Sequence, residues 1–179
     1  MTDVEREEEE RRYDESASDK TRVFDSKVLE HSLRVLESKP AVHVSSGDSV
    51  ADVIQRMRQD RNGCALVVDG GRLVGIFTER DILLQVVCGG VDPDGTHVSE
   101  VMTSDPESLT AEDNVGALLN KMAVSGFRHV PIVDAAGRPQ AVISMREAME
   151  YLADFFPEEA LNLPPRSFEN RPPRNQYGG

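Results

Sequence analysis

The stretch Val44–Asp69, VSSGDSVADVIQRMRQDRNGCALVVD, decides the fold of this chain, because the same pattern returns as Leu109–Asp134, LTAEDNVGALLNKMAVSGFRHVPIVD. Met57 lies over Met122, 65 residues later, and the other apolar positions of the stretch keep this offset. Self-similarity at a fixed period indicates that one supersecondary unit is used twice. The chain is therefore expected to contain two copies of the same small unit.

Each copy predicts the element order β-α-β-β-α. Apolar residues at positions i, i+3, i+4 and i+7 from Val50 and from Val115 predict one amphipathic helix per copy. Short apolar runs separated by turn residues predict a buried strand, a hairpin turn and a returning strand. A second helix is expected after Thr78 and after Ser144. The predicted strands are Ala41–Val44, Ala65–Val68 and Leu73–Phe77 in the first copy and Ser108–Leu109, Val130–Val133 and Gln140–Ile143 in the second.

Two further local signals concern helix starts and the region before the repeat. Ser45 and Asp48 have the spacing of a capping box, as do Thr110 and Asp113 in the second copy. Upstream, the apolar residues of 28–36 fall at helical spacing. We therefore expect a capping box before the first helix of each copy and a short leading helix over 28–36.

The packing of the two copies follows from their size. A unit of roughly 50 residues with few aromatic side chains cannot bury a sufficient core alone. The two copies are therefore expected to pack sheet against sheet about an approximate two-fold axis, which gives a mixed α/β (α+β) fold. The expected parts are an acidic disordered tail (1–22), the first repeat with its leading helix (23–88), a connector (89–97), the second repeat (98–154) and a C-terminal extension (155–179) that packs on the pair or on a second subunit.

Composition excludes several classes of function. The net charge of −12 disfavours nucleic acids as partners, because their phosphate backbones repel an acidic protein. No apolar run approaches the roughly 20 residues that a membrane span needs. The acidic start is not a secretory signal. Cys64 and Cys88 share no motif and are expected to be reduced thiols, which favours a cytoplasmic location.

Three motifs in the right order carry a family resemblance. They are GIFTERD at Gly75–Asp81, VSEVMTSDPESL at Val98–Leu109 and FRHVPIVD at Phe127–Asp134. Together they make the chain resemble a tandem cystathionine-β-synthase (CBS) domain pair, or Bateman module. The resemblance implies a non-catalytic regulatory module that forms a homodimer and binds AMP, ADP, ATP or S-adenosylmethionine between its repeats. Because the chain holds no output domain, it also implies a separate effector protein.

The resemblance also implies a first cleft built from both repeats. Thr78 would hydrogen-bond a phosphate, and Asp81 would accept from the ribose hydroxyls. Gly75 would let its strand approach a flat base closely. The adenine or phosphate side would be lined by Met102, Thr103, Arg128, His129 and Pro131. Thr78-x-x-Asp81 is equally a capping box, so a purely structural role for these two residues stays open.

The second cleft is less well equipped. Ala141 replaces the glycine, Ser144 replaces the threonine, and Glu147 is longer than the aspartate that it replaces. Cys64 lies in the register position of His129 and would line this second cleft. Cys64 and His129 could also approach each other across the pseudo-two-fold axis, which is the basis of a weak alternative in which they bind a metal. The main alternative function is a structural interaction dimer with vestigial clefts.

Overall fold

The computed structural model describes residues 26–36, 38 and 40–155. Contacts divide the chain into two units, and one of them, Asp25–Leu152, holds both repeats. The other unit consists of the two ends of the chain, of which the structure describes only residues 153–155. The expected acidic tail and all but the first residue of the expected C-terminal extension therefore lie outside the described residues.

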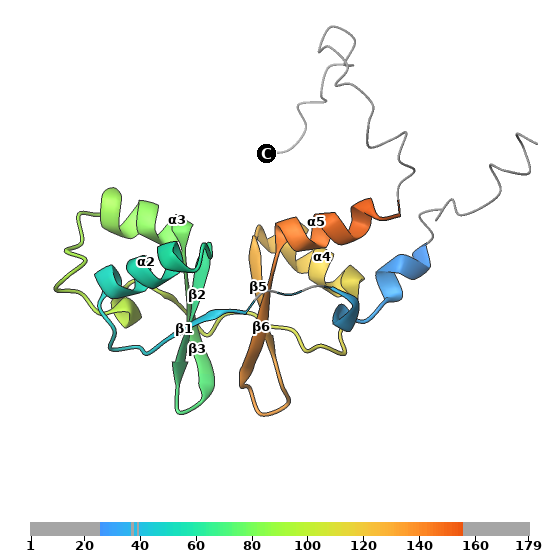
Figure 1. The fold of residues 1–179 in the computed structure, drawn as a ribbon, viewed down its shortest axis with the longest axis horizontal. Coiled ribbons are helices and arrows are strands. Elements are labelled where there is room, and N and C mark those ends of the chain that lie inside the picture. The colour runs from blue at the N-terminus through green and yellow to red at the C-terminus, as the bar shows by residue number, and fades with distance from the viewer. Residues whose placement is uncertain (1–25, 37, 39, 156–179) are drawn as a thin grey trace, which may run out of the picture. The chain divides into compact units, whose positions relative to one another are not determined.

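The first copy forms a four-stranded sheet with order β1-β2-β3-β4 (Figure 1). Strand β1 pairs parallel to β2, and the other two pairings are antiparallel. The fourth strand is short and comes from the start of the second copy. The elements are β1 (Val42–Val44), α2 (Val50–Gln59), β2 (Cys64–Asp69), β3 (Arg72–Thr78), α3 (Glu79–Asp81), the π-helix η3 (Ile82–Val87) and β4 (Thr103–Ser104).

The second copy repeats this order with one reduction. The predicted strand at Ser108–Leu109 is a single parallel bridge from Leu109 to Ile132. This bridge matches the pairing of Val44 with Val67 in the first copy, 65 residues earlier. The elements are α4 (Val115–Ser125), β5 (His129–Val133), β6 (Pro139–Ser144) and α5 (Met145–Ala153). The β-α-β-β-α order predicted for each copy is confirmed, and the first strand of the second copy is reduced to one pair.

The capping boxes predicted before the first helices were wrong by one turn. The N-cap of α2 is Ser49, whose Oγ accepts a hydrogen bond from the backbone N–H of Asp52 at 3.1 Å. Asp48 instead closes a preceding turn by accepting from the N–H of Ser45 at 3.2 Å. The second copy repeats this arrangement with Asn114 as the N-cap of α4 and Thr110 and Asp113 in the turn.

The predicted leading helix is replaced by two 3-10 helices, η1 (Ser26–Glu30) and η2 (Leu33–Val35). A bridge between Ser32 and Asn114 separates them, so the backbone cannot continue as one α-helix. Leu33 and Leu36 are buried in the core of the second copy, although the segment precedes the first copy in sequence.

The segment that precedes the second copy makes the reciprocal contact. It contains the 3-10 helix η4 (Val98–Glu100), and Val98 is buried in the core of the first copy. The Val98 N–H donates to the Asp48 carbonyl at 2.9 Å, and the Leu33 N–H donates to the Asp113 carbonyl at 2.8 Å. Both partners are shifted by the same 65 residues. The two copies therefore exchange their leading segments.

The expected packing of sheet against sheet is confirmed. A core cluster of Cys64, Leu66, Ile76 and Val142 joins the first sheet to β6. At the hairpin tips, the Nε of Arg72 donates to the carbonyl of Ala136 at 2.9 Å. The two copies are thus joined by apolar strand faces and by backbone contacts between their hairpins.

Candidate ligand-binding cleft

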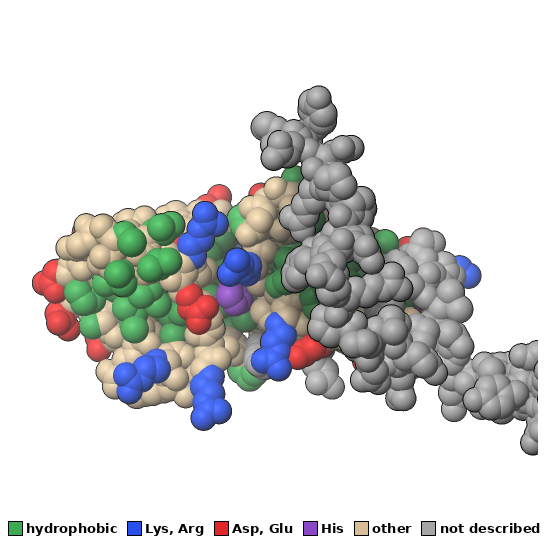
Figure 2. Space-filling model, turned by 90° about the horizontal axis from the view of Figure 1, so that it is seen from above, with side chains coloured by type: hydrophobic (Ala, Val, Ile, Leu, Met, Phe, Trp, Pro, Cys, Tyr) green, Lys and Arg blue, Asp and Glu red, His purple; other side chains and the backbone are tan. Residues whose placement is uncertain are grey.

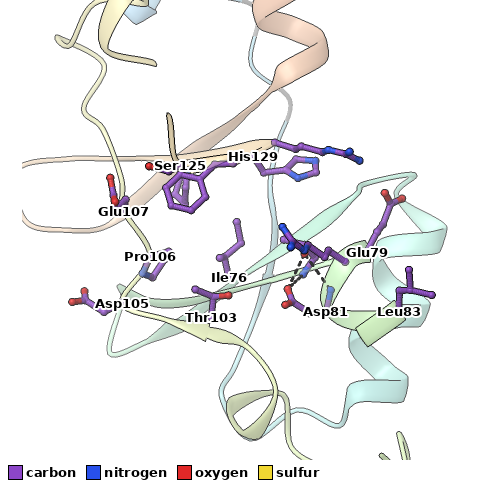
Figure 3. Close-up of a pocket in the computed structure, with 16 residues that line it drawn as sticks. Ile76, Glu79, Asp81, Leu83, Thr103, Asp105, Pro106, Glu107, Ser125 and His129 are labelled. Carbon is purple, nitrogen blue, oxygen red and sulfur yellow. Dashed lines mark hydrogen bonds between the residues drawn. The ribbon is translucent and has the colours of Figure 1, made fainter. Parts of the chain in front are cut away.

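A pocket with a volume of about 890 Å³ opens between the two copies. It is formed by the end of β3 with α3 and the first turn of η3, by β4 with the loop after it, and by the end of α4 with the start of β5 (Figure 3). Its lining residues are Ile76, Thr78, Glu79, Arg80, Asp81, Leu83, Thr103, Asp105, Pro106, Glu107, Ser125, Gly126, Phe127, Arg128, His129 and Pro131.

The structure brings most of the predicted first-cleft residues together. The residues that line the pocket are Thr78, Asp81, Thr103, Arg128, His129 and Pro131. Gly75 and Met102 do not line it. A Cβ placed on Gly75 would lie 2.2 Å from the Sδ of Met102, so the glycine makes room for this side chain, which packs against the first core. The structure thus gives Gly75 a packing role in place of the predicted approach to a flat base.

Thr78 and Asp81 form a complete capping box at the start of α3. The Oδ2 of Asp81 accepts from the N–H of Thr78 at 2.8 Å and from its hydroxyl at 2.7 Å. The backbone N–H of Asp81 donates back to the Thr78 Oγ1 at 3.4 Å. Within the described residues, no donor is hydrogen-bonded to the other carboxylate oxygen, Oδ1. One oxygen of Asp81 therefore stabilises the helix start, and the second can accept from a ligand.

Two guanidinium groups face the pocket without anionic partners. Arg80 and Arg128 line the pocket, and neither makes a hydrogen bond or ion pair with any side chain in the part of the chain that the structure describes. By contrast, Glu107 at the other end of the pocket is paired with Lys121. Unpaired guanidinium groups are well suited to bind a phosphate or carboxylate.

His129 lies beside these arginines and is half-buried. Burial lowers its pKa, the negative charges of Glu79 and Glu147 oppose this shift, and Arg128 adds to it. A Cβ placed on Gly63 would lie 3.0 Å from the His129 Nε2, so the ring packs on the backbone of the first copy. His129 is therefore held at the junction of the two copies.

The pocket has an apolar wall that the predicted residues did not include. Ile76, Pro106 and Phe127 contribute to it, and Figure 3 shows Ile76 and Pro106 on the opposite side of the pocket from Leu83. Each of the three lies inside one of the quoted motifs. Glu79 and Arg80, also missed, lie between Thr78 and Asp81. Position within a motif was thus the available signal, but the chemical roles of neighbouring positions were not distinguished.

The second copy places the same capping arrangement among different side chains. The Oε2 of Glu147 accepts from the N–H of Ser144 at 2.6 Å and from its hydroxyl at 2.9 Å. Glu147 is buried, as is Cys64, which is only 2% exposed. Burial raises the pKa of the Cys64 thiol to about 12, and the charges of Glu147 and Glu79 add to this effect. The thiol therefore stays protonated at neutral pH.

The second cleft also lacks unpaired cationic groups. Gly63 and Cys64 occupy the register positions of Arg128 and His129. Arg146, which corresponds to Arg80, is paired with Glu150 at 2.7 Å. Among the described residues, no group of three or more His, Cys, Asp or Glu side chains is placed to hold a metal ion, which includes the surroundings of Cys64 and His129.

Exposed apolar side chains gather on the helices of the first copy. Leu83, Leu84 and Val87 of η3 are each about half exposed or more. Figure 2 shows hydrophobic side chains grouped on this face, with cationic side chains and a histidine beside them. Met149 of α5, in the register position of Leu83, is 55% exposed. Within the described residues, no helix is long and apolar enough to cross a membrane.

The CBS domain family model matches residues 34–87 and 98–154, so the chain belongs to the CBS domain family, as a pair of its domains. A CBS domain-containing protein from Arabidopsis thaliana, CBSCBSPB1, is 36% identical over 102 residues, which cover 57% of this chain and 19% of that protein. The chain thus spans about a fifth of the length of this relative.

Solved structures show the same fold. A CBS domain protein from Pyrobaculum aerophilum, solved in complex with AMP, is 25% identical, with a TM-score of 0.63 over 70% of this chain and 98% of that one. A CBS domain pair solved with 5′-methylthioadenosine and S-adenosyl-L-methionine is 21% identical, with a TM-score of 0.62 over 69% of this chain and 96% of that one. The fold class and the family resemblance are both confirmed by these comparisons.

Proposed function

We propose that this chain is a non-catalytic regulatory module that binds one adenosine-containing ligand in the first cleft and signals its presence to an effector protein. The candidate ligands are AMP, ADP, ATP and S-adenosylmethionine. Because its two cysteines are free thiols, we place the module in the cytoplasm. The observation that carries the proposal is the pocket between the copies, with unpaired Arg80 and Arg128 at one end and an apolar wall at the other.

Each part of an adenosine ligand has a complementary group in this pocket. Ile76, Pro106 and Phe127 offer an apolar surface to a flat base. The Oδ1 of Asp81 is available to ribose hydroxyls, in a charge-assisted hydrogen bond. Arg80 and Arg128 suit a phosphate. The AMP complex of the Pyrobaculum aerophilum protein, which is similar in fold and 25% identical, supports a ligand of this class.

We further propose that the chain forms a homodimer through the second helices of the two copies. Leu83 and Met149 occupy the same register position and are 54% and 55% exposed, which supports a repeated apolar contact. Leu84 and Val87 extend the apolar surface in the first copy. Sedimentation of the wild type and of Val87→Glu tests this proposal. A wild type that sediments as a monomer at micromolar concentration would contradict it.

The test of ligand binding is thermal unfolding with and without millimolar AMP, ATP and S-adenosylmethionine. A ligand that binds the native state raises the midpoint in proportion to its affinity. We expect at least one of the three to do so, and we expect Thr78→Ala to reduce the shift. If none of the three shifts the midpoint, the sensing function is wrong.

The alternative is a structural interaction module whose clefts bind nothing. One observation favours it, because the capping box already accounts for the placement of Thr78 and Asp81. It predicts that Thr78→Ala lowers the stability of the free protein without any ligand-dependent difference. The unpaired cations of the first cleft favour ligand binding over this alternative.

A further inference from the structure

His129 differs from the other cationic or titratable groups of the first cleft because it also contacts the second copy's counterpart strand. Its imidazole packs on Gly63 at the start of β2, where an added Cβ would lie 3.0 Å from Nε2 and 3.1 Å from Cε1. The same added Cβ would lie 3.4 Å from the Glu79 Oε2. The ring is therefore confined between a backbone segment and a carboxylate while it lines the pocket.

Charged and titratable groups face this imidazole from every element packed around it. Glu79 approaches from α3, Glu147 from α5, and Arg128 precedes it in the chain. Cys64, on β2, is uncharged at neutral pH because burial raises its pKa to about 12. Burial is the largest influence on His129 and lowers its pKa below the ordinary value, so the ring is neutral in the empty cleft at pH 7.5.

A phosphate in the cleft would reverse this balance. A phosphomonoester carries close to two negative charges above its second pKa of about 6. A dianion held by Arg80 and Arg128 would lie near a half-buried imidazole, and a nearby opposite charge favours the charged form of a titratable group. The two carboxylates, Glu79 and Glu147, already act in the same direction. The proton would come from solvent and bind the unprotonated ring nitrogen.

We propose that His129 takes up one proton when a ligand with a terminal phosphomonoester binds the first cleft, and that this makes the cleft select such a ligand over uncharged or cationic adenosyl compounds. This inference rests on the proposed function and narrows it from adenosyl ligands in general to nucleoside monophosphates. The second cleft cannot act in this way, because its corresponding residue is the buried, protonated Cys64.

The sign of the pH dependence follows from the two protonation states. Because the complex holds the proton more tightly than the empty cleft, affinity falls as pH rises between the two pKa values of His129. The steepest possible fall is about tenfold per pH unit, for one proton linked to binding. Below about pH 6 the phosphate itself is protonated, which opposes binding. The informative range is therefore pH 6.5 to 8.5.

The experiment is calorimetric titration of the full chain with AMP, adenosine and S-adenosylmethionine at pH 7.5, in two buffers with different ionisation enthalpies. For AMP we expect uptake of between about 0.5 and one proton, and weaker binding at pH 8.5 than at pH 6.5. Adenosine and S-adenosylmethionine should bind more weakly than AMP and take up no proton. His129→Gln should abolish the uptake and flatten the pH profile, while His43→Gln, at an exposed position on β1, should behave as wild type.

The outcomes separate this inference from the proposed function. If AMP binds the wild type without proton uptake, or if His129→Gln retains the uptake, the inference is overturned and the sensing function stands. Tighter binding of S-adenosylmethionine than of AMP would have the same consequence. If none of the three compounds binds, the proposed function and this inference are both wrong. Because the wild-type titrations decide the matter alone, a variant that folds poorly does not leave the inference untested.

Discussion

Ser144 and Glu147 of the second copy repeat the side-chain hydrogen bonds that Thr78 and Asp81 make in the first. Around this shared cap, the first copy places Arg128 and His129 and the second places glycine and cysteine. The cap is therefore the part that the fold requires, since both copies keep it. The cationic groups are present in one copy only, so they are the part that a function of the first cleft requires.

The largest effect is expected from breaking the exchange of leading segments. Leu33 is 4% exposed in the core of the second copy, and a buried Leu→Ala change costs about 2–5 kcal/mol. We expect Leu33→Ala to lower the free energy of unfolding by about 3 kcal/mol, measured by urea denaturation. Val35→Ala, in the same short helix but 49% exposed, is the matched control and should change it by less than about 0.5 kcal/mol. Equal losses in the two variants would show that the leading segment is not part of the core.

The next largest effect sharpens the difference between the clefts. Loss of a hydrogen bond to a charged group costs about 1.5–3 kcal/mol, so Arg128→Ala should weaken AMP binding roughly tenfold or more in a calorimetric titration. Arg146→Ala removes the cation of the second cleft, which is already paired with Glu150. It should leave AMP affinity unchanged. A similar loss in both variants would mean that the second cleft is also occupied.

A smaller effect separates capping from binding. Thr78→Ala and Ser144→Ala each remove the hydroxyl at a helix start, which costs about 1 kcal/mol of stability. Thermal unfolding without ligand should show this loss for both variants. In the presence of AMP, only Thr78→Ala should show a reduced ligand-induced shift. If the shift is reduced equally in both, Thr78 contributes to binding through helix stability alone.

The smallest effect is expected from a thiol reagent. Cys88 is exposed, while Cys64 is buried with a pKa of about 12 and so forms almost no thiolate at pH 8. The native protein should titrate one fast thiol per chain with a disulfide reagent, and the second should appear only in denaturant. Cys88→Ser should then show no fast thiol. Rapid modification of Cys64 in this variant would mean that the second cleft is open to solvent.

The repeat itself could be predicted because its helices and hairpins keep the same apolar pattern and spacing. The exchange of leading segments could not, because Leu33 corresponds to Val98 in a stretch with few other matches. The helix starts were placed one turn too early because Ser45 and Ser49 both precede an aspartate by three residues. Only the start of the amphipathic pattern at Val50 distinguishes these two serines.

The cleft residues were predictable as positions and less so as roles. Thr78, Asp81 and His129 line the pocket, as the family resemblance implied. The packing of Met102 on Gly75 depends on a contact between two strands that are distant in sequence, which spacing alone does not reveal. The pairing state of Arg80 is likewise a property of its surroundings and not of the motif that contains it.

The exchange of leading segments also sets the order in which the two cores can be completed during synthesis. The first core draws on residues from Val42 to Met102, so all of its members are made before the second copy begins. The second core needs Leu33 and Leu36, which are made first, and Ala148, which is among the last. As chains are synthesised from the N-terminus, these two leucines leave the ribosome before the first core and find their partners only after it. A growing chain therefore carries one finished core and, ahead of it, an apolar segment that waits for a core not yet made.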